Sequence, residues 1–428
     1  MRRPRFRLTT VVVAVALTAA ACGGTSDTDS GDGQVSLQFV LFGDAAETAG
    51  YERMLEAFES QHADIDVTLS PVASQDELLA KLTTSFAGGQ PPDVFLINFR
   101  KYGQFASQGA LEEVGPYLAD SDVLDPDDFF EVVFDPFRFD GETLTCMPQN
   151  VSSLVVYYNQ DLFEASGVAP PIEGWTWDEF LATAQAITDG EVYGLGTDPS
   201  LIRIAPFVWS NGGEVVDDLE APTTLSLDEG TAREALDWFL DLSLVHGVVP
   251  PDVEEQSESS ESRFLNGRLG MYLNSRRVTP TLREIDGFTW DVAPLPVAPG
   301  GQPFTMLHSD AYCMAGPGEH HAESWRLIEF AMSEAGQRIL AESGRTVPSR
   351  RDVASSDVFV ESEAPPPSAH VFVDNAEILR ATPHTATWTR VEKAADDVLE
   401  QIYYGRIDRE EGVVRLIDET RPLFGAGG

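Results

Sequence analysis

The sequence has 428 residues, 43% of them hydrophobic and 10% aromatic, which is the composition of a folded globular protein and not of a disordered chain. Acidic residues number 70 against 28 basic ones, and the formal net charge of -42 argues against nucleic acid as a partner. We interpret the excess of acid as a solvated surface, with adaptation to a salty or cation-rich wall environment as the alternative.

The first 34 residues have the pattern of an export signal. Arginines at positions 2, 3, 5 and 7 precede an apolar run over residues 11–21, and small residues lie directly before Cys22. The apolar run is shorter than the roughly 20 residues that span a bilayer, which argues against a transmembrane anchor. Residues 19–22 resemble a bacterial lipobox, although Ala19 stands where such motifs usually carry Leu, Val or Ile.

We therefore predict a lipoprotein signal peptide over residues 1–21, acylation of Cys22 and a flexible tether over residues 22–34. The protein would then be extracytoplasmic and bound to the bacterial cell membrane through its lipid anchor only. Secretion without a lipid is the alternative.

The other two cysteines are Cys146 and Cys313. If Cys22 carries lipid, they remain as a pair in an oxidising compartment, where a disulfide is one interpretation and two buried free thiols are the other. Neither has a second cysteine or a histidine at ligand spacing, so we predict no metal site there.

About 390 residues follow the signal and tether, more than one ordinary core accommodates, so two lobes are expected. Apolar runs at residues 35–41, 65–69 and 93–97 predict buried strands, and the segments between them carry apolar residues at helical spacing. This βαβαβ pattern predicts a parallel sheet covered by helices, with a ligand site beyond the carboxyl ends of its strands.

The middle and end of the chain are less regular. Thr176 and Glu179 form a capping box that predicts the start of a helix. Further strands are expected at residues 154–158, 269–273 and 290–295, and an apolar segment follows at 311–315. Further helices are expected at residues 231–244, 322–332 and 334–342, and again after about residue 372.

Four motifs occur in a fixed order behind the lipobox: GQPPDV at 89–94, YYNQDLF at 157–163, WTWDEF at 175–180 and FLNGRLGM at 264–271. This order resembles the family 1 extracellular solute-binding proteins, the carbohydrate receptors of ABC importers similar to maltose-binding protein. The likeness covers roughly residues 35–350. The motifs end helices and start strands, so they identify a fold and not a ligand.

The resemblance implies an α/β, two-lobed periplasmic-binding-protein-like fold, with a ligand cleft between the lobes and several hinge crossings. Lobe 1 would comprise residues 35–148 plus 309–344, and lobe 2 residues 149–308 plus 345–428. Cys146 and Cys313 would then lie on neighbouring crossing strands. The implied function is capture of a sugar or oligosaccharide by lobe closure and its delivery to an ABC permease and ATPase complex, by a monomer that needs no cofactor.

Sugars present apolar faces and a rim of hydroxyls, so their sites use aromatic rings and planar polar groups. Each candidate also has a structural alternative, such as a helix cap for Asp44, a core position for Trp209, a tight turn for Gly212 and surface ion pairs for Arg276 and Arg345. We predict the following ligand-binding residues on loops that face the cleft: Phe42, Asp44, Asn98, Gln149, Asn150, Trp209, Asn211, Gly212, Asn274, Arg276, His308, Asp310 and Arg345.

Other functions were weighed against this one. A polyol or a glycerol-phosphate-type solute is the alternative cargo, and a phosphate would require clustered arginines or helix N-termini in the site. The sequence contains no Gly-x-Ser-x-Gly elbow, phosphate-binding loop or His-Glu-x-x-His helix, so we predict that the protein is not an enzyme. A secreted glycoside hydrolase stays an alternative, because the separation of its paired carboxylates is not visible in a sequence.

Overall fold

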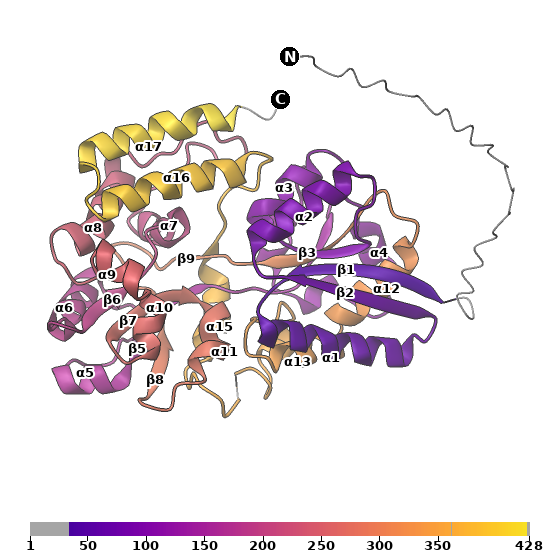
Figure 1. Ribbon diagram of the computed structural model, residues 1–428, viewed down its shortest axis with the longest axis horizontal. Helices are drawn as coiled ribbons and strands as arrows, with labels where there is room; N and C mark the ends of the chain where they lie inside the picture. Colours follow the sequence, from indigo (N-terminus) through magenta and orange to yellow (C-terminus); the bar gives the residue numbers. More distant parts are fainter. Residues whose placement is uncertain (1–33, 361, 426–428) are drawn as a thin grey trace, which may run out of the picture. The chain divides into compact units, whose positions relative to one another are not determined.

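A computed structural model describes residues 34–360 and 362–425 of the chain (Figure 1). The predicted signal peptide, Cys22 and all but the last residue of the predicted tether lie outside these residues. The residues from Val35 onward form one compact unit. Within the described part of the chain, no helix is long and apolar enough to cross a membrane.

The first sheet has the strand order β2-β1-β3-β10-β4. β1 pairs in parallel with both β2 and β3, which confirms the predicted βαβαβ pattern, whereas β10 runs antiparallel to β3 and to β4. The sheet and its first two connecting helices are β1 (Val35–Phe42), α1 (Ala45–Gln61), β2 (Ile65–Val72), α2 (Gln75–Ala87), β3 (Val94–Asn98), β4 (Cys146–Pro148) and β10 (Asp310–Met314).

Helix α1 illustrates how the sequence forms this layer. The Asp44 carboxylate caps it by accepting a hydrogen bond from the Glu47 backbone N–H at 2.9 Å. Tyr51, Met54 and Phe58 recur at helical spacing and are fully buried. The helix also contacts α12 (His321–Met332) and α13 (Glu334–Ala341), two of the helices that the sequence predicted.

The second sheet has the order β6-β7-β5-β8, with β5 antiparallel to β7 and β8 and with β6 parallel to β7. The predicted capping box at Thr176 and Glu179 is present and starts α6. The strands and helices of this part are β5 (Leu154–Asn159), α5 (Gln160–Ser166), α6 (Trp177–Ile187), β6 (Tyr193–Gly196), α7 (Leu201–Ser210), α8 (Gly230–Leu244), α9 (Asp252–Ser257), α10 (Ser260–Leu265), β7 (Leu269–Ser275), α11 (Thr279–Leu282) and β8 (Trp290–Ala293).

The end of the chain is mainly helical, as predicted, with α14 (Arg351–Ala354), α15 (His370–Asp374), α16 (Trp388–Tyr403) and α17 (Arg409–Phe424). A short strand that the sequence did not indicate, β11 (Leu379–Arg380), pairs with β9 (Thr305–Met306). The long helices α16 and α17 run side by side (Figure 1), and α16 also contacts α7, α8 and α3 (Phe99–Ala106).

Residues 149–153 and 307–310 connect the five-stranded sheet to the part that holds the four-stranded sheet, and residues 346–350 lie beside them; we call all three the crossing segments. They lie side by side, because Ser152 and His308 exchange backbone hydrogen bonds of 2.8 Å and the Val151 N–H donates to the Val347 oxygen at 3.0 Å. The first segment leads from β4 to β5, the second from β9 to β10, and the third from α13 to α14. Polar side chains on these segments are therefore held close together.

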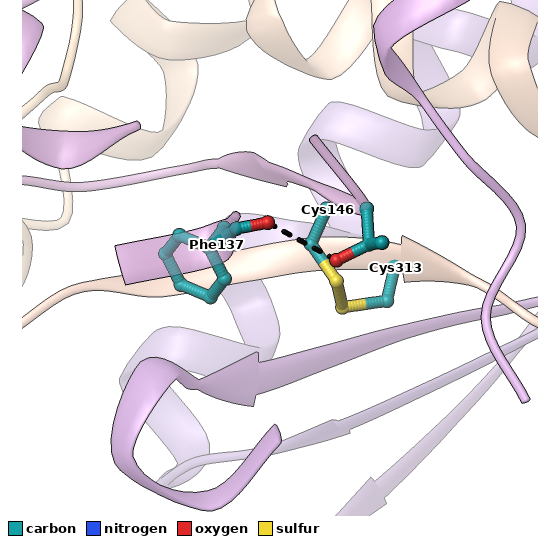
Figure 2. The surroundings of a disulfide bond; sticks show 4 residues. Phe137, Cys146 and Cys313 are labelled. Atoms are coloured by element: carbon teal, nitrogen blue, oxygen red, sulfur yellow. Dashed lines mark hydrogen bonds between the residues drawn. A yellow bond between two sulfur atoms is a disulfide. The ribbon is translucent and has the colours of Figure 1, made fainter. Parts of the chain in front are cut away.

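The structure joins Cys146 and Cys313 by a disulfide (Figure 2). The two residues face each other on β4 and β10, with their Cα atoms 4.4 Å apart and both side chains fully buried. Phe137 is drawn beside them, and its carbonyl oxygen accepts hydrogen bonds of 3.1 Å from the backbone N–H and the hydroxyl of Thr145. The bond thus lies within one sheet, next to the point where two crossing segments begin.

Candidate ligand-binding site

Asp310, at the start of β10, is the centre of a hydrogen-bonded group of predicted residues. Its carboxylate accepts from the Asn98 side-chain amide at 2.9 Å and from that of Asn150 at 3.3 Å. The Asn150 amide also donates to Gln149 at 2.8 Å. Loss of water raises the pKa of the Asp310 carboxyl, although the two amide donors act in the opposite direction. The structure therefore brings together four planar polar side chains at the carboxyl end of β3.

Asp44 and Arg345 form a second polar group near the first. The Arg345 guanidinium donates to Asp44 at 2.6 Å and contacts Glu47, one turn into α1. Burial raises the pKa of Glu47 to about 8, because the loss of water outweighs the attraction of Arg345. Asp44 is thus both a helix cap and one half of an ion pair. Arg345 is also close enough to Asp310 to lower that carboxyl's pKa.

Three arginines outside the predicted set lie around the predicted residue His308. Arg100 is in the first turn of α3, Arg203 is in the first turn of α7, and Arg277 follows β7 in a 3-10 turn (Arg276–Val278). Loss of water, followed by the charges of these three guanidinium groups, holds the pKa of His308 well below its usual value. His308 is therefore neutral although three arginines lie near it. Arg100 follows β3 of the five-stranded sheet, and Arg203 and Arg277 belong to the part that holds the four-stranded sheet.

These residues carry buried polar atoms that have no hydrogen-bond partner in the described part of the chain. They are the Ser152 hydroxyl, Nε2 of His308, Nε of Arg100, and Nε and one terminal nitrogen of Arg203. Arg203 does donate to the predicted residue Asn274, at 3.0 Å. Because buried polar groups are nearly always hydrogen-bonded, the unpartnered atoms gathered here make this region a candidate site for a polar ligand.

The remaining predicted residues lie apart from this group or support it. Phe42 ends β1 and is buried, two residues before Asp44. Trp209 lies in the last turn of α7, where the Arg380 guanidinium is 5.0 Å from the centre of its ring. Asn211 donates to the Thr231 carbonyl at 2.9 Å, and Gly212 has a φ of 78°, as expected for a turn.

The contacts of Arg276 are with other parts of the protein and indicate a structural role. Its Nε donates to the Gly344 carbonyl at 2.7 Å, and its guanidinium lies 4.5 and 4.9 Å from the ring centres of Phe359 and Phe372. Burial lowers the pKa of Arg276 to about 9. The structure therefore separates the adjacent Arg276 and Arg277, with the first packed between two rings and the second near His308.

A cavity of about 1310 Å³ is lined by other residues, from β8, α15 and residues 130–132. Among residues 34–360 and 362–425, none of the predicted ligand-binding residues lines it, and neither does any buried polar atom that lacks a partner. We place the candidate site at the crossing segments because hydrogen-bonding capacity is concentrated there. Among the described residues, no group of three or more His, Cys, Asp or Glu side chains is arranged to hold a metal ion.

Comparison with known proteins agrees with a binding protein. Residues 43–338 match the family described as bacterial extracellular solute-binding protein, and this is more than half of the chain. The chain therefore belongs to this family, whose members bind solutes and are not enzymes.

Individual relatives cover nearly the whole chain. A binding protein of Brucella abortus is 26% identical over 371 residues, 85% of this chain and 87% of its own length. The galactooligosaccharide-binding protein of Bacillus subtilis is 21% identical over 95% of this chain and 94% of its own. The structure of a Listeria monocytogenes ABC substrate-binding protein in complex with cycloalternan has a TM-score of 0.84 at 21% identity, covering 92% of this chain and 99% of that one. The predicted α/β periplasmic-binding-protein fold is thereby confirmed, although the two larger sheets are mixed and the sequence predicted a parallel one.

Proposed function

We propose that the protein is the sugar receptor of an ABC importer, which captures a sugar or oligosaccharide and delivers it to a membrane permease and its ATPase. Family membership supports a binding role. The names of the Bacillus subtilis relative and of the Listeria monocytogenes structure support an oligosaccharide as the cargo and an ABC transporter as the partner.

The observation that carries the proposal is the group of planar side chains around Asp310. A carboxylate held by the amides of Asn98 and Asn150 presents fixed donors and acceptors, which suit the paired hydroxyls of a sugar. Ser152, on the same crossing segment as Asn150, and His308, on the same segment as Asp310, add buried polar atoms. The site thus offers a sugar many hydrogen bonds without any group poised for covalent chemistry.

The proposed mechanism is capture by closure of two lobes, residues 35–148 plus 309–344 and residues 149–308 plus 345–428. The first lobe would contain the five-stranded sheet and the second the four-stranded sheet. Ligand can shift the equilibrium only by binding the closed state more tightly than the open one. The crossing segments carry the polar group and link the lobes, so contacts made there can bias closure directly.

We further propose that Cys22 is acylated and that the protein acts as a monomer tethered to the outer face of the cell membrane. The support is the export signal with its lipobox-like end. Expression of Cys22→Ala in a bacterial host should move the protein from the membrane fraction to the medium. A variant that stays with the membrane fraction would contradict the lipid anchor.

Thermal unfolding of residues 34–428 against neutral sugars, oligosaccharides, polyols and glycerol phosphates tests the function. A ligand at 100 times its dissociation constant stabilises by about 2.7 kcal/mol, which corresponds to a shift of several degrees. We expect a shift with a carbohydrate and no product. Consumption of the ligand would favour a hydrolase, and no shift with any sugar would contradict the proposal.

A matched pair of asparagine variants tests the position of the site. Asn150→Ala removes a donor to Asp310 and should weaken the best ligand at least about tenfold, since a hydrogen bond to a charged group contributes about 1.5 to 3 kcal/mol. Asn211→Ala removes bonds to the Thr231 carbonyl and to Glu234, away from the group around Asp310, and should leave affinity unchanged. Equal effects of the two substitutions would contradict the assigned position.

A further inference from the structure

Positive charge is concentrated at the crossing segments of an otherwise acidic chain. The sequence has 70 acidic and 28 basic residues, yet Arg100, Arg203 and Arg277 are all near enough to His308 to lower its pKa. Arg277 and Arg100 also lower the pKa of Arg203, after the larger effect of burial. The contacts agree: Arg203 donates to Asn274 at 3.0 Å, three residues before Arg277 in the sequence. Arg100 pairs with Glu392, one turn of α16 before Asp396, which holds the start of α7.

The carboxylates of the same region neutralise this charge unevenly. Glu392 of α16 pairs with Arg100 and also accepts from the Trp388 indole at 3.2 Å. Asp396, also near Arg100, accepts from the Leu201 backbone N–H at 2.7 Å, and burial raises the pKa of its carboxyl to about 7. Glu392 thus balances Arg100, whereas the Asp396 carboxyl is largely protonated below about pH 7. Asp310, the third carboxylate, is bound by Asn98 and Asn150.

Arg203 is left with little compensation, and the carboxyl near Arg277, that of Glu47, is already in contact with Arg345 and has its pKa raised by burial. The nearest carboxylate to Arg203 is that of Asp198, 3.6 Å away with a side chain that is 67% exposed. Arg203 is only 5% exposed, and two of its nitrogens have no partner among the described residues. The Arg277 side chain is exposed, and its guanidinium makes no hydrogen bond or ion pair with any described residue.

A neutral sugar would satisfy the N–H groups but not the charge. Burying a guanidinium is costly unless an opposite charge accompanies it. The planar fork of arginine matches the oxygens of a carboxylate or phosphate in a paired geometry that a sugar hydroxyl cannot reproduce. A ligand that closes over Arg203 is therefore favoured when it brings a negative charge.

We propose that the solute is an acidic sugar, carrying a carboxylate or a phosphate that Arg203 and Arg277 bind beside His308. The inference rests on the proposed function, because it names the class of sugar that the same site takes. The inference names an acidic sugar in place of a neutral one. The arginines that support it are Arg203 and Arg277, whereas the sequence analysis predicted Arg276 and Arg345. The sugar ring would lie against the group around Asp310, with its acid group towards α7 and the end of β7.

The test is calorimetric titration of residues 34–428 at low ionic strength with matched probes. Galactose, galacturonate and galactose 6-phosphate form one set, and glucose, glucuronate and glucose 6-phosphate form the other, with inorganic phosphate as a separate probe. We expect an acidic member of one set to bind at least about tenfold more tightly than its neutral partner, and its affinity to fall as salt is added. Comparison of the two uronates with the two sugar phosphates shows whether the bound acid group is a carboxylate or a phosphate.

Substitution of two arginines at opposite ends of β7 tests where the acid group of the ligand binds. Arg277→Gln should reduce the ratio of acidic to neutral affinity about tenfold, and its exposed side chain makes loss of folding an unlikely complication. Arg268→Gln removes a surface cation paired with Glu258 and should leave that ratio unchanged. Arg277→Lys should restore part of the ratio.

The outcomes separate the inference from the function on which it rests. Binding of neutral sugars with equal or weaker binding of their acids would overturn the inference and leave the proposed function intact. Failure of every acidic sugar and of inorganic phosphate to bind would also overturn it. Failure of the neutral sugars and oligosaccharides as well would overturn the proposed function.

Discussion

Removal of the disulfide should destabilise the fold without changing the affinity for ligand. Cys146 and Cys313 are 167 residues apart in the sequence, and in the chain-entropy description a loop of that length corresponds to about 5 kcal/mol at 25 °C. Measured values often fall below this figure, so we expect Cys146→Ala with Cys313→Ala to lower the free energy of unfolding by about 3 to 5 kcal/mol. Because both residues lie on adjacent strands of one sheet, the crossing segments should keep their arrangement.

Urea unfolding followed by tryptophan fluorescence measures the change, with calorimetric titration for affinity. The wild-type protein in reducing buffer is the control, since it lacks the bond but keeps both sulfur atoms and so separates the bond from the packing of the side chains. Stability of the double variant within about 1 kcal/mol of the oxidised wild type would refute the reasoning. A changed affinity would show that the bond also constrains the crossing segments.

Two further substitutions test the electrostatics and the packing. The Asp396 carboxyl, with a pKa raised from 3.8 to about 7, binds its proton more tightly in the folded state, so its contribution to stability is complete below about pH 4 and is lost as the pH rises to about 7. Asp396→Asn should therefore have the same free energy of unfolding as the wild type near pH 4. At about pH 8 its free energy of unfolding should be higher by about 2 to 4 kcal/mol. If urea titrations gave the variant and the wild type the same pH dependence, this reasoning would be contradicted. A Cβ on Gly103 would lie 2.1 Å from the His384 carbonyl oxygen, so Gly103→Ala should lower the free energy of unfolding by about 2 kcal/mol or more. The control is Gly287→Ala, whose Cβ would meet open space and should change the melting temperature little.

Much of the fold could be predicted because local patterns agreed with the global arrangement. The apolar runs that became β1, β2 and β3 alternate with amphipathic helices, and this alternation has few topological solutions. The capping box at Thr176 specified the start of α6 from two side chains alone. The pairing of β11 with β9 could not be predicted, because each strand has only two residues.

The candidate site was only partly predictable, because a sequence does not show which way a side chain faces. Asn98, Asn150 and Asp310 come together since each lies at a strand end or on a crossing segment. Arg276 and Arg277 lie in a 3-10 turn after β7, where successive side chains point about a third of a turn apart, and the sequence does not show which of them is near His308.

Arg203 was not among the predicted residues, and Trp209 was predicted on a loop next to the turn at Gly212. The structure instead has the helix α7 at both positions, with Pro206 inside it and Trp209 in its last turn. A role for the Trp209 ring in ligand binding stays a prediction. Once the helix is known, Arg203 in its first turn becomes a candidate.

A crystal structure with the ligand that gives the largest thermal shift tests the central claim most directly. We predict that the sugar lies within hydrogen-bond distance of Asp310 and His308, with any acid group against Arg203 and Arg277. A ligand bound instead in the cavity lined by β8 and α15 would contradict the assignment of the site.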